Sequence, residues 1–207
     1  MTTKSSPSNT HIDVLNRYQH WETHAKNLFF ESSNLELDVF TKASESLENF
    51  AKDSDINVVI LTGDAGHGKT HLCGSLLSSL TGESLLKAAE TMNEGNNGIV
   101  LIEKILDDGR NLRFIKDLSD GQIKDLPVLF VEVLNDDKCL TVICANDGIL
   151  RNTCDGTETL SPIVELLNAS VLEGKMKEGR IVLLNLNHQS VVSNTADETL
   201  VRKVLKQ

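Results

Sequence analysis

The chain has 207 residues, of which 40% are hydrophobic and 24% charged, and its formal net charge is -10. A chain of this size can bury a substantial core, but its acidic balance argues against a surface that grips nucleic acid by itself, leaving at most a local basic patch. No apolar run approaches the ~20 residues that span a bilayer, and the N-terminus lacks the apolar segment of a secretion signal, so we expect a cytoplasmic protein with no membrane partner.

Two helices are predicted before the first strand. Residues 1–10 are rich in Ser, Thr and Pro, which predicts a disordered N-terminus. From Ile12, apolar residues recur at three- and four-residue steps and predict an amphipathic helix to residue 29. A second helix is predicted from Ser33 or Asn34 to the break at residues 53–55, with one apolar stripe: Val39, Phe40, Ala43, Leu47 and Phe50. Residues 11–55 therefore form a helical lead-in.

A phosphate-binding motif follows the first predicted strand. Residues 63–70 read GDAGHGKT, a full match to GxxxxGK[ST], and come directly after the apolar run 57–62 (NVVILT). The pattern arises by chance in about one chain in a hundred of this length. The alternative is a glycine-rich turn before a buried helix, but the preceding strand and the helical run over residues 69–80 favour a loop whose backbone N–H groups surround phosphates.

The residues of this motif have separate expected roles in binding ATP and Mg²⁺. Lys69 would reach the β- and γ-phosphates, and the Thr70 hydroxyl would ligate Mg²⁺. The backbone N–H of His67 would lie close to the γ-phosphate, while His71 is expected to be a packing or solvent residue of the helix. The predicted nucleotide-binding residues are Gly63, Asp64, Ala65, Gly66, His67, Gly68, Lys69, Thr70 and His71.

Strands separated by helix-length connections are predicted over the rest of the chain. Residues 83–94 and 162–171 read as helices, and residues 99–106 are ambiguous between strand and helix. The strand candidates are residues 112–115 (LRFI), 140–145 (LTVICA) and 180–186 (RIVLLNL). This pattern predicts a parallel sheet with helical crossovers.

The run 127–134 (PVLFVEVL) has strand-like composition, but only the short turn 135–138 (NDDK) separates it from the strand starting at Leu140. A parallel crossover requires a dozen or more residues, so the two runs form either a hairpin or a helix followed by a strand. We favour the helix, with Asp125 as its cap and Pro127 in its first turn.

Two further positions are candidates for the catalytic machinery of a P-loop enzyme. Asp117 ends the strand candidate 112–115 and is predicted to be the carboxylate on the Mg²⁺ side, the alternative being a surface turn. The residue after it is Leu118 rather than a water-polarising Glu; Asp120 could substitute, but efficient hydrolysis is in question. If residues 127–134 were the strand, Glu132 or Asp136 would take the role of Asp117.

Asn146 ends the strand candidate 140–145, where its amide could orient water near the γ-phosphate. The alternative is a plain Asn-Asp-Gly turn.

The four cysteines, Cys73, Cys139, Cys144 and Cys154, show no CxxC pairing, and we expect buried free thiols rather than a metal site or a disulfide.

The order of these elements resembles the core of the AAA+ and STAND-type ATPases. The strings LTGDAGHGKTHL, ICANDGILR and LLNLNHQSV are also similar to ATPases of bacterial DNA-restriction and anti-phage systems, including those acting with phosphorothioated DNA. The resemblance covers about residues 34–190 and implies a three-layer α/β P-loop fold with a mostly parallel sheet, preceded by two helices. It assigns phosphate and Mg²⁺ binding to Lys69 and Thr70, the Walker B role to Asp117 and the sensor 1 role to Asn146.

The resemblance also implies a function within a larger assembly. It predicts an ATPase with protein partners or self-assembly, reaching DNA through partners or missing domains; the alternative is a nucleotide-gated switch with little hydrolysis. The helical lid of the family is not visible in residues 194–207, so the chain could be a fragment of a longer protein. A GTPase is disfavoured because the sequence contains no NKxD motif.

Overall fold

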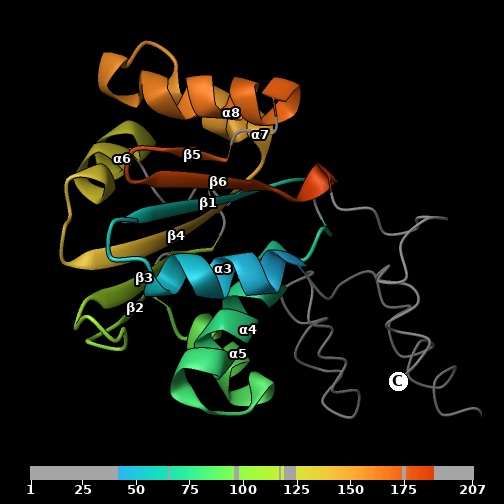
Figure 1. The fold of residues 1–207 in the computed structure, drawn as a ribbon, viewed down its shortest axis with the longest axis vertical. Coiled ribbons are helices and arrows are strands. Elements are labelled where there is room, and N and C mark those ends of the chain that lie inside the picture. The colour runs from blue at the N-terminus through green and yellow to red at the C-terminus, as the bar shows by residue number, and fades with distance from the viewer. Residues whose placement is uncertain are drawn as a thin grey trace, which may run out of the picture. The chain divides into compact units, whose positions relative to one another are not determined.

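Six strands form one mixed, mostly parallel sheet in the part of the chain that the computed structural model describes (Figure 1). The described residues are 42–64, 66–95, 98–116, 118, 125–173 and 176–188. The strand order is β2-β3-β4-β1-β6-β5. The strands are β1 (Val58–Thr62), β2 (Ile99–Ile102), β3 (Asn111–Ile115), β4 (Cys139–Ala145), β5 (Lys177–Glu178) and β6 (Ile181–Asn185). The predicted strands 57–62, 112–115, 140–145 and 180–186 are thus confirmed.

The central strand β1 is parallel to both of its neighbours, β4 and β6. The register pairs Thr62 with Ala145 on one side and with Asn185 on the other. The three strands therefore end in one row, and the segments that follow them meet at the carboxyl edge of the sheet. The outer strands β2 and β5 are antiparallel to β3 and β6, a feature the sequence did not indicate.

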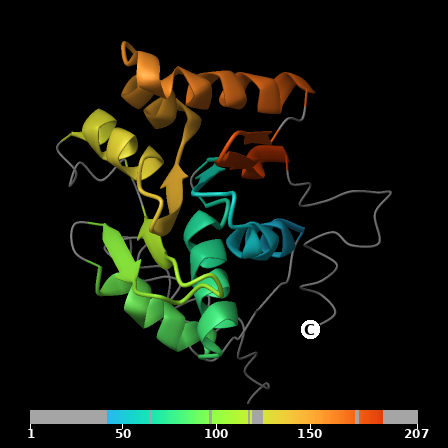
Figure 2. The ribbon, with the colours of Figure 1, turned by 60° about the vertical axis from the view of Figure 1, so that its left-hand side comes forward.

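Helices cover both faces of the sheet (Figures 1 and 2). Every residue of β1 and β4 is buried, as expected for parallel strands covered on two sides. Val59 and Leu61 of β1 face one core with α3 (Lys42–Lys52), α4 (Lys69–Thr81) and α5 (Leu85–Asn93). Val58 and Ile60 face the other core with α6 (Leu126–Leu134), α7 (Asp147–Cys154) and α8 (Ser161–Glu173). The two 3₁₀ turns are η2 (Glu158–Leu160) and η3 (Leu186–His188).

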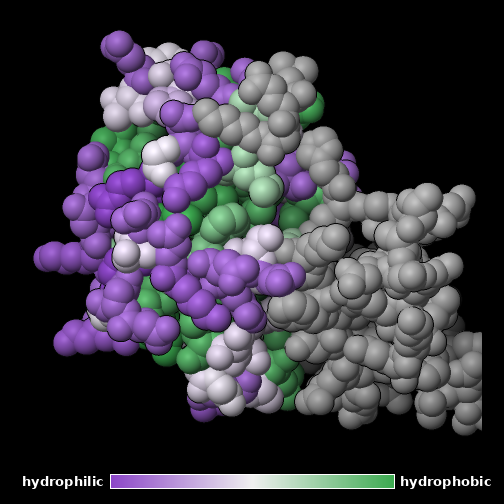
Figure 3. Space-filling view, in the orientation of Figure 1, coloured by the Kyte–Doolittle hydropathy of each residue, from purple (hydrophilic) through white to green (hydrophobic). Residues whose placement is uncertain are grey.

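Helix α3 is the described part of the predicted second helix. Its buried stripe, Ala43, Leu47 and Ala51, lies at four-residue steps on one face. Its outward side is hydrophilic in Figure 3. Residues 1–41, which include the predicted disordered start and the first helix, lie outside the described residues, and all of the described residues belong to one compact unit, Leu37–Gln207.

Residues 127–134 form a helix rather than one strand of a hairpin, which confirms the favoured prediction. In α6 the Asp125 carboxylate accepts a hydrogen bond from the Val128 N–H at 3.3 Å, and Pro127 lies in the first turn. Residues 83–94 and 162–171 are helical as α5 and α8, and the ambiguous run 99–106 begins with strand β2. The short loop between β2 and β3 joins them as a hairpin, because a parallel pair would need a longer crossover.

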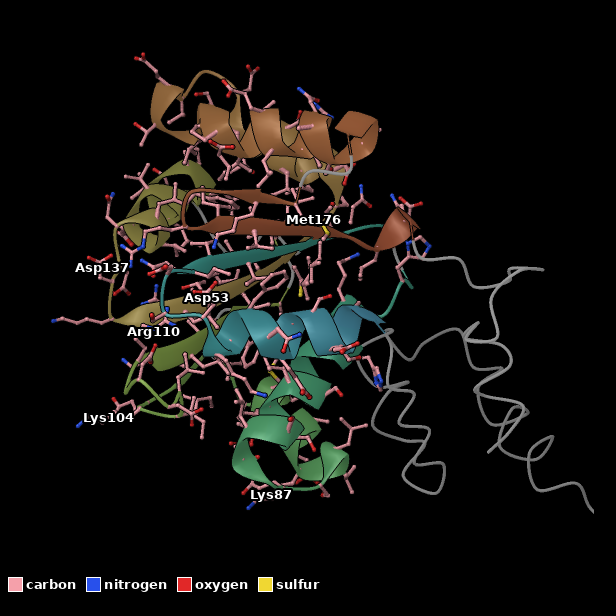
Figure 4. All side chains as sticks on the ribbon, viewed as in Figure 1. Asp53, Lys87, Lys104, Arg110, Asp137 and Met176 are labelled. Atoms are coloured by element: carbon pink, nitrogen blue, oxygen red, sulfur yellow. The ribbon has the colours of Figure 1, made fainter. Side chains whose placement is uncertain are left out.

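The amino ends of the central strands are tied together by their own polar side chains. The buried Asn57 precedes β1, and its amide donates to Asp137 at 3.0 Å and accepts from Arg180 at 2.7 Å. Arg110 donates to the backbone carbonyl of Asp53 at 3.1 Å. Figure 4 shows Asp53, Arg110 and Asp137 at this same end of the sheet. These hydrogen bonds join the segments that precede β1, β3, β4 and β6.

All four cysteines are buried and free, as predicted. Cys73 on α4 and Cys144 on β4 face each other, with 3.5 Å between their Sγ atoms. The hydrogen bond to Cys144 and burial together raise the pKa of Cys73. Burial raises the pKa of Cys154 to about 11.

The high pKa of Cys154 predicts slow alkylation in the folded protein. At about pH 8 a thiol with a pKa of about 11 is ~0.1% ionised, against roughly a quarter for an unperturbed cysteine, and the thiolate is the reactive form. Alkylation of Cys154 by iodoacetamide should be at least about a hundredfold slower in the folded chain than in the unfolded chain. The folded rate should rise about tenfold per pH unit up to about pH 10, which peptide mass spectrometry can follow. Equal folded and unfolded rates would contradict this burial.

Candidate functional site

The loop between β1 and α4 carries the sequence motif at the carboxyl edge of the sheet. Three of its glycines have positive φ angles: 147° for Gly63, 85° for Gly66 and 80° for Gly68. Residues with side chains rarely adopt this backbone conformation. A Cβ atom on Gly63 would in addition lie 3.2 Å from Oδ1 of Asn187. The motif glycines are therefore required by the path of the backbone.

Helix α4 begins directly after the loop without a side-chain cap. Its N-cap residue is Gly68, which has no side chain that could accept a capping hydrogen bond. The Leu72 N–H donates to the Gly68 carbonyl at 2.9 Å. The N–H groups of the first turn therefore have no side-chain acceptor at the cap, and the positive end of the helix dipole lies at the loop. Both features suit an anion, such as a phosphate group.

The Lys69 ammonium folds back over the loop. Its Nζ donates to the carbonyl of Gly63 at 2.7 Å and to that of Asp64 at 2.9 Å. These acceptors are neutral, so the positive charge of Lys69 is available to an anionic ligand. Thr70 follows in the first turn of α4, where it is exposed.

This donor set fits a polyphosphate: it combines an ammonium group, backbone N–H groups at a helix start and an exposed hydroxyl. Among the described residues, no group of three or more His, Cys, Asp or Glu side chains could hold a metal ion. Mg²⁺ at phosphate sites is held by few protein ligands together with phosphate oxygens and water, and the exposed Thr70 hydroxyl could supply one of those ligands.

The other predicted residues of the motif lie around the same loop. The exposed His67 donates its backbone N–H to the Asp64 carbonyl at 3.3 Å. A Cβ atom added to Gly63 would lie 3.3 Å from the ring Nδ1 of His67. His71 is half-buried in the first turn of α4. Ala65 lies outside the described residues.

Asp117 and Asp120, the predicted Walker B carboxylate and its neighbour, also lie outside the described residues, so these two assignments stay predictions. Their strand β3 is separated from β1 by β4. Leu118, which follows Asp117 directly in the sequence, is buried.

The two alternative carboxylates do not lie at the carboxyl edge of a strand. Glu132 is exposed on α6, and Asp136 precedes β4 at its amino end. Asp136 accepts a hydrogen bond from Arg113 at 2.5 Å. Burial alone would raise the pKa of Asp136, but hydrogen bonds from Cys139 and Arg113 outweigh it and lower the pKa. Because residues 127–134 are a helix, the condition for these alternatives does not hold.

Asn146 caps a helix that the sequence did not reveal. Its Oδ1 accepts a hydrogen bond from the Ile149 N–H at 2.8 Å, which makes it the N-cap of α7. The amide oxygen is therefore engaged with the protein backbone, while the amide NH₂ is the part of Asn146 that could contact a ligand or water.

Two side chains that sequence reasoning missed bond to residues in or directly before the loop, and they come from the segments that follow β4 and β6. Asp147, the first residue of α7 after β4, accepts a hydrogen bond from the hydroxyl of Thr62, the last residue of β1. Asn187 in η3, after β6, accepts a hydrogen bond from the Asp64 N–H at 3.0 Å. The only sequence signal was a polar residue close behind a strand.

Two surface hollows lie away from the loop. The first has a volume of about 740 Å³ and is lined by Ile99, Arg113, Leu129, Glu132, Asn135, Asp136, Asp137 and Lys138. The second, of about 470 Å³, is formed by α7, η2 and the start of α8. Arg113 and Asp136, two of the residues that line the first hollow, pair with each other.

A comparison of the chain with known protein families, curated proteins and solved structures finds no match. Among the helices of the described residues, none combines the length and the apolar character needed to span a membrane. The function is therefore argued from the loop and its surroundings.

Proposed function

We propose that the chain binds Mg·ATP at the loop between β1 and α4 and hydrolyses it. The observation that supports this most strongly is the arrangement of the GDAGHGKT loop, with Lys69 folded across it and α4 starting directly behind it. ATP is preferred over GTP because the sequence has no NKxD motif. By its resemblance to AAA+ and STAND-type ATPases, the chain would serve a larger bacterial DNA-defence assembly, with DNA reached through partners.

In this proposal each group of the site has a separate role. Lys69 leaves the carbonyls of Gly63 and Asp64 and neutralises charge on the β- and γ-phosphates. The backbone N–H groups of the loop and the first turn of α4 hold the remaining phosphate oxygens. Thr70 would ligate Mg²⁺, which supplies further charge neutralisation when bound. Asp117 would be the carboxylate on the Mg²⁺ side, and Asp120 and the amide NH₂ of Asn146 would orient the attacking water.

The second candidate is a nucleotide-gated switch that binds Mg·ATP but turns it over slowly. Two observations favour it: the position after Asp117 is the buried Leu118, and the Asn146 oxygen is engaged in capping α7. Both reduce the number of polar groups that could activate water.

A binding titration tests the common part of both candidates. Isothermal titration calorimetry with ATP, ADP and GTP, each with and without Mg²⁺, should show Mg²⁺-dependent binding of ATP. ATP at a hundredfold excess over Kd should raise the free energy of unfolding by about 2.7 kcal/mol. Absence of both effects would contradict the proposal. Steady-state ATPase assays with and without DNA then separate the candidates, because rapid turnover by the chain alone would reject the switch.

A further inference from the structure

A hydrogen bond between Thr62 and Asp147 joins the strand before the loop to the helix after β4. Thr62 is completely buried at the end of β1, and Asp147 is half-buried at the start of α7. The parallel register, which pairs Thr62 with Ala145, brings the two residues together. A carboxylate only accepts hydrogen bonds, so the Thr62 hydroxyl must point at Asp147, and its orientation is fixed.

This bond lies one residue from the loop carbonyls that hold Lys69. Gly63 follows Thr62 directly, and its carbonyl accepts from the Lys69 ammonium at 2.7 Å. The next residue, Asp64, donates its backbone N–H to the side-chain oxygen of Asn187, which follows β6 on the other side of β1. The Thr62–Asp147 bond therefore lies directly before the carbonyl that accepts from Lys69.

We infer that Asp147 is a positioning residue of the nucleotide site, acting through Thr62 on the first turn of the loop. The inference rests on the proposed function and adds to it a residue that contacts no ligand. Asp147 holds Thr62, Thr62 fixes Gly63, and the loop is thereby kept in the shape that receives phosphate. Such preorganisation raises affinity because less freedom is lost on binding.

The structure offers matched variants for the test. Thr62→Val removes the donor, Asp147→Ala removes the acceptor, and Asp147→Asn keeps an acceptor oxygen without the charge. Thr141→Val is the control: Thr141 is a fully buried threonine of β4 whose hydroxyl has no hydrogen-bond partner in the described part of the protein. Each variant is first checked for folding by circular dichroism.

Titration with a fluorescent ATP analogue and Mg²⁺ gives the first readout. Thr62→Val and Asp147→Ala should each weaken binding about tenfold, which corresponds to roughly 1.4 kcal/mol, and the double variant should be no weaker than either. Asp147→Asn and Thr141→Val should bind within about threefold of the parent, since one retains the hydrogen bond and the other never had it.

Hydrogen exchange of the nucleotide-free protein gives a second readout that does not depend on ATP. Peptides covering residues 61–72 should exchange faster in Thr62→Val and Asp147→Ala, but not in Asp147→Asn. Unchanged exchange and affinity in both would overturn the inference. It would also be overturned if Asp147→Asn lost as much affinity as Asp147→Ala while Thr62→Val bound normally, because the charge itself would then be required. Failure of the parent to bind the analogue, with the exchange pattern as expected, would instead reject the nucleotide function and with it the role of Asp147 toward ATP.

Discussion

Replacing Lys69 with alanine should weaken ATP binding at least about a hundredfold while leaving the fold intact. The ammonium contacts only the loop carbonyls of Gly63 and Asp64 among the described residues, so its loss removes little from the folded state. In the complex it would donate to two charged phosphates, and hydrogen bonds to charged groups contribute about 1.5–3 kcal/mol each. Two such bonds correspond to a hundredfold or more in Kd. Calorimetric titration with Mg·ATP measures the effect.

Lys87→Ala is the matched control for this prediction. Lys87 is exposed on α5 and pairs with Glu83 one helical turn away. Its truncation should leave both ATP affinity and stability nearly unchanged, because exposed ion pairs contribute little. If Lys69→Ala bound ATP as tightly as the parent and Lys87→Ala, the nucleotide site would have to lie elsewhere.

The loop and the central strands were predictable because their signals are local. The GxxxxGK[ST] spacing requires glycine at Gly63 and Gly68, and these two and Gly66, at a variable position of the motif, all have the positive φ that favours glycine. Helix α6 was predictable because four residues cannot connect two parallel strands and because Asp125 and Pro127 indicate a helix start rather than a hairpin. Strand β4 was predictable because it is an unbroken apolar run, which matches its burial on both faces.

Other elements were not predictable because distant partners create them. Strand β5 consists of the exposed Lys177 and Glu178, which have no apolar alternation and are ordered by pairing with β6. Helix α7 starts within an Asn-Asp-Gly sequence that is typical of turns, and the capping hydrogen bond of Asn146 stabilises the start of the helix. The sequence showed neither element.

The contacts at the loop depend on the order of the strands in the sheet, which could not be predicted from the sequence. Thr62 and Asp147 are 85 positions apart, and Asp64 and Asn187 are 123 apart. They meet because β4 and β6 both adjoin β1 in parallel register. The sequence predicts the carboxylate on the Mg²⁺ side at Asp117, after β3, and that assignment stays a prediction. Asn146 and Asp147 instead follow β4, one of the two strands that adjoin β1.

The position of the central strands between two helical layers predicts the largest effect on stability. Leu140→Ala should lower the free energy of unfolding by about 3 kcal/mol, because Leu140 is completely buried in β4 and its truncation leaves a cavity. Leu101→Ala, the same change on edge strand β2, should cost less than about 1 kcal/mol, because Leu101 is 48% exposed. Urea unfolding measures both, and the slope m should stay constant if the folded state keeps its compactness. Similar losses in the two variants would place β4 outside the core and contradict the sheet order on which the loop depends.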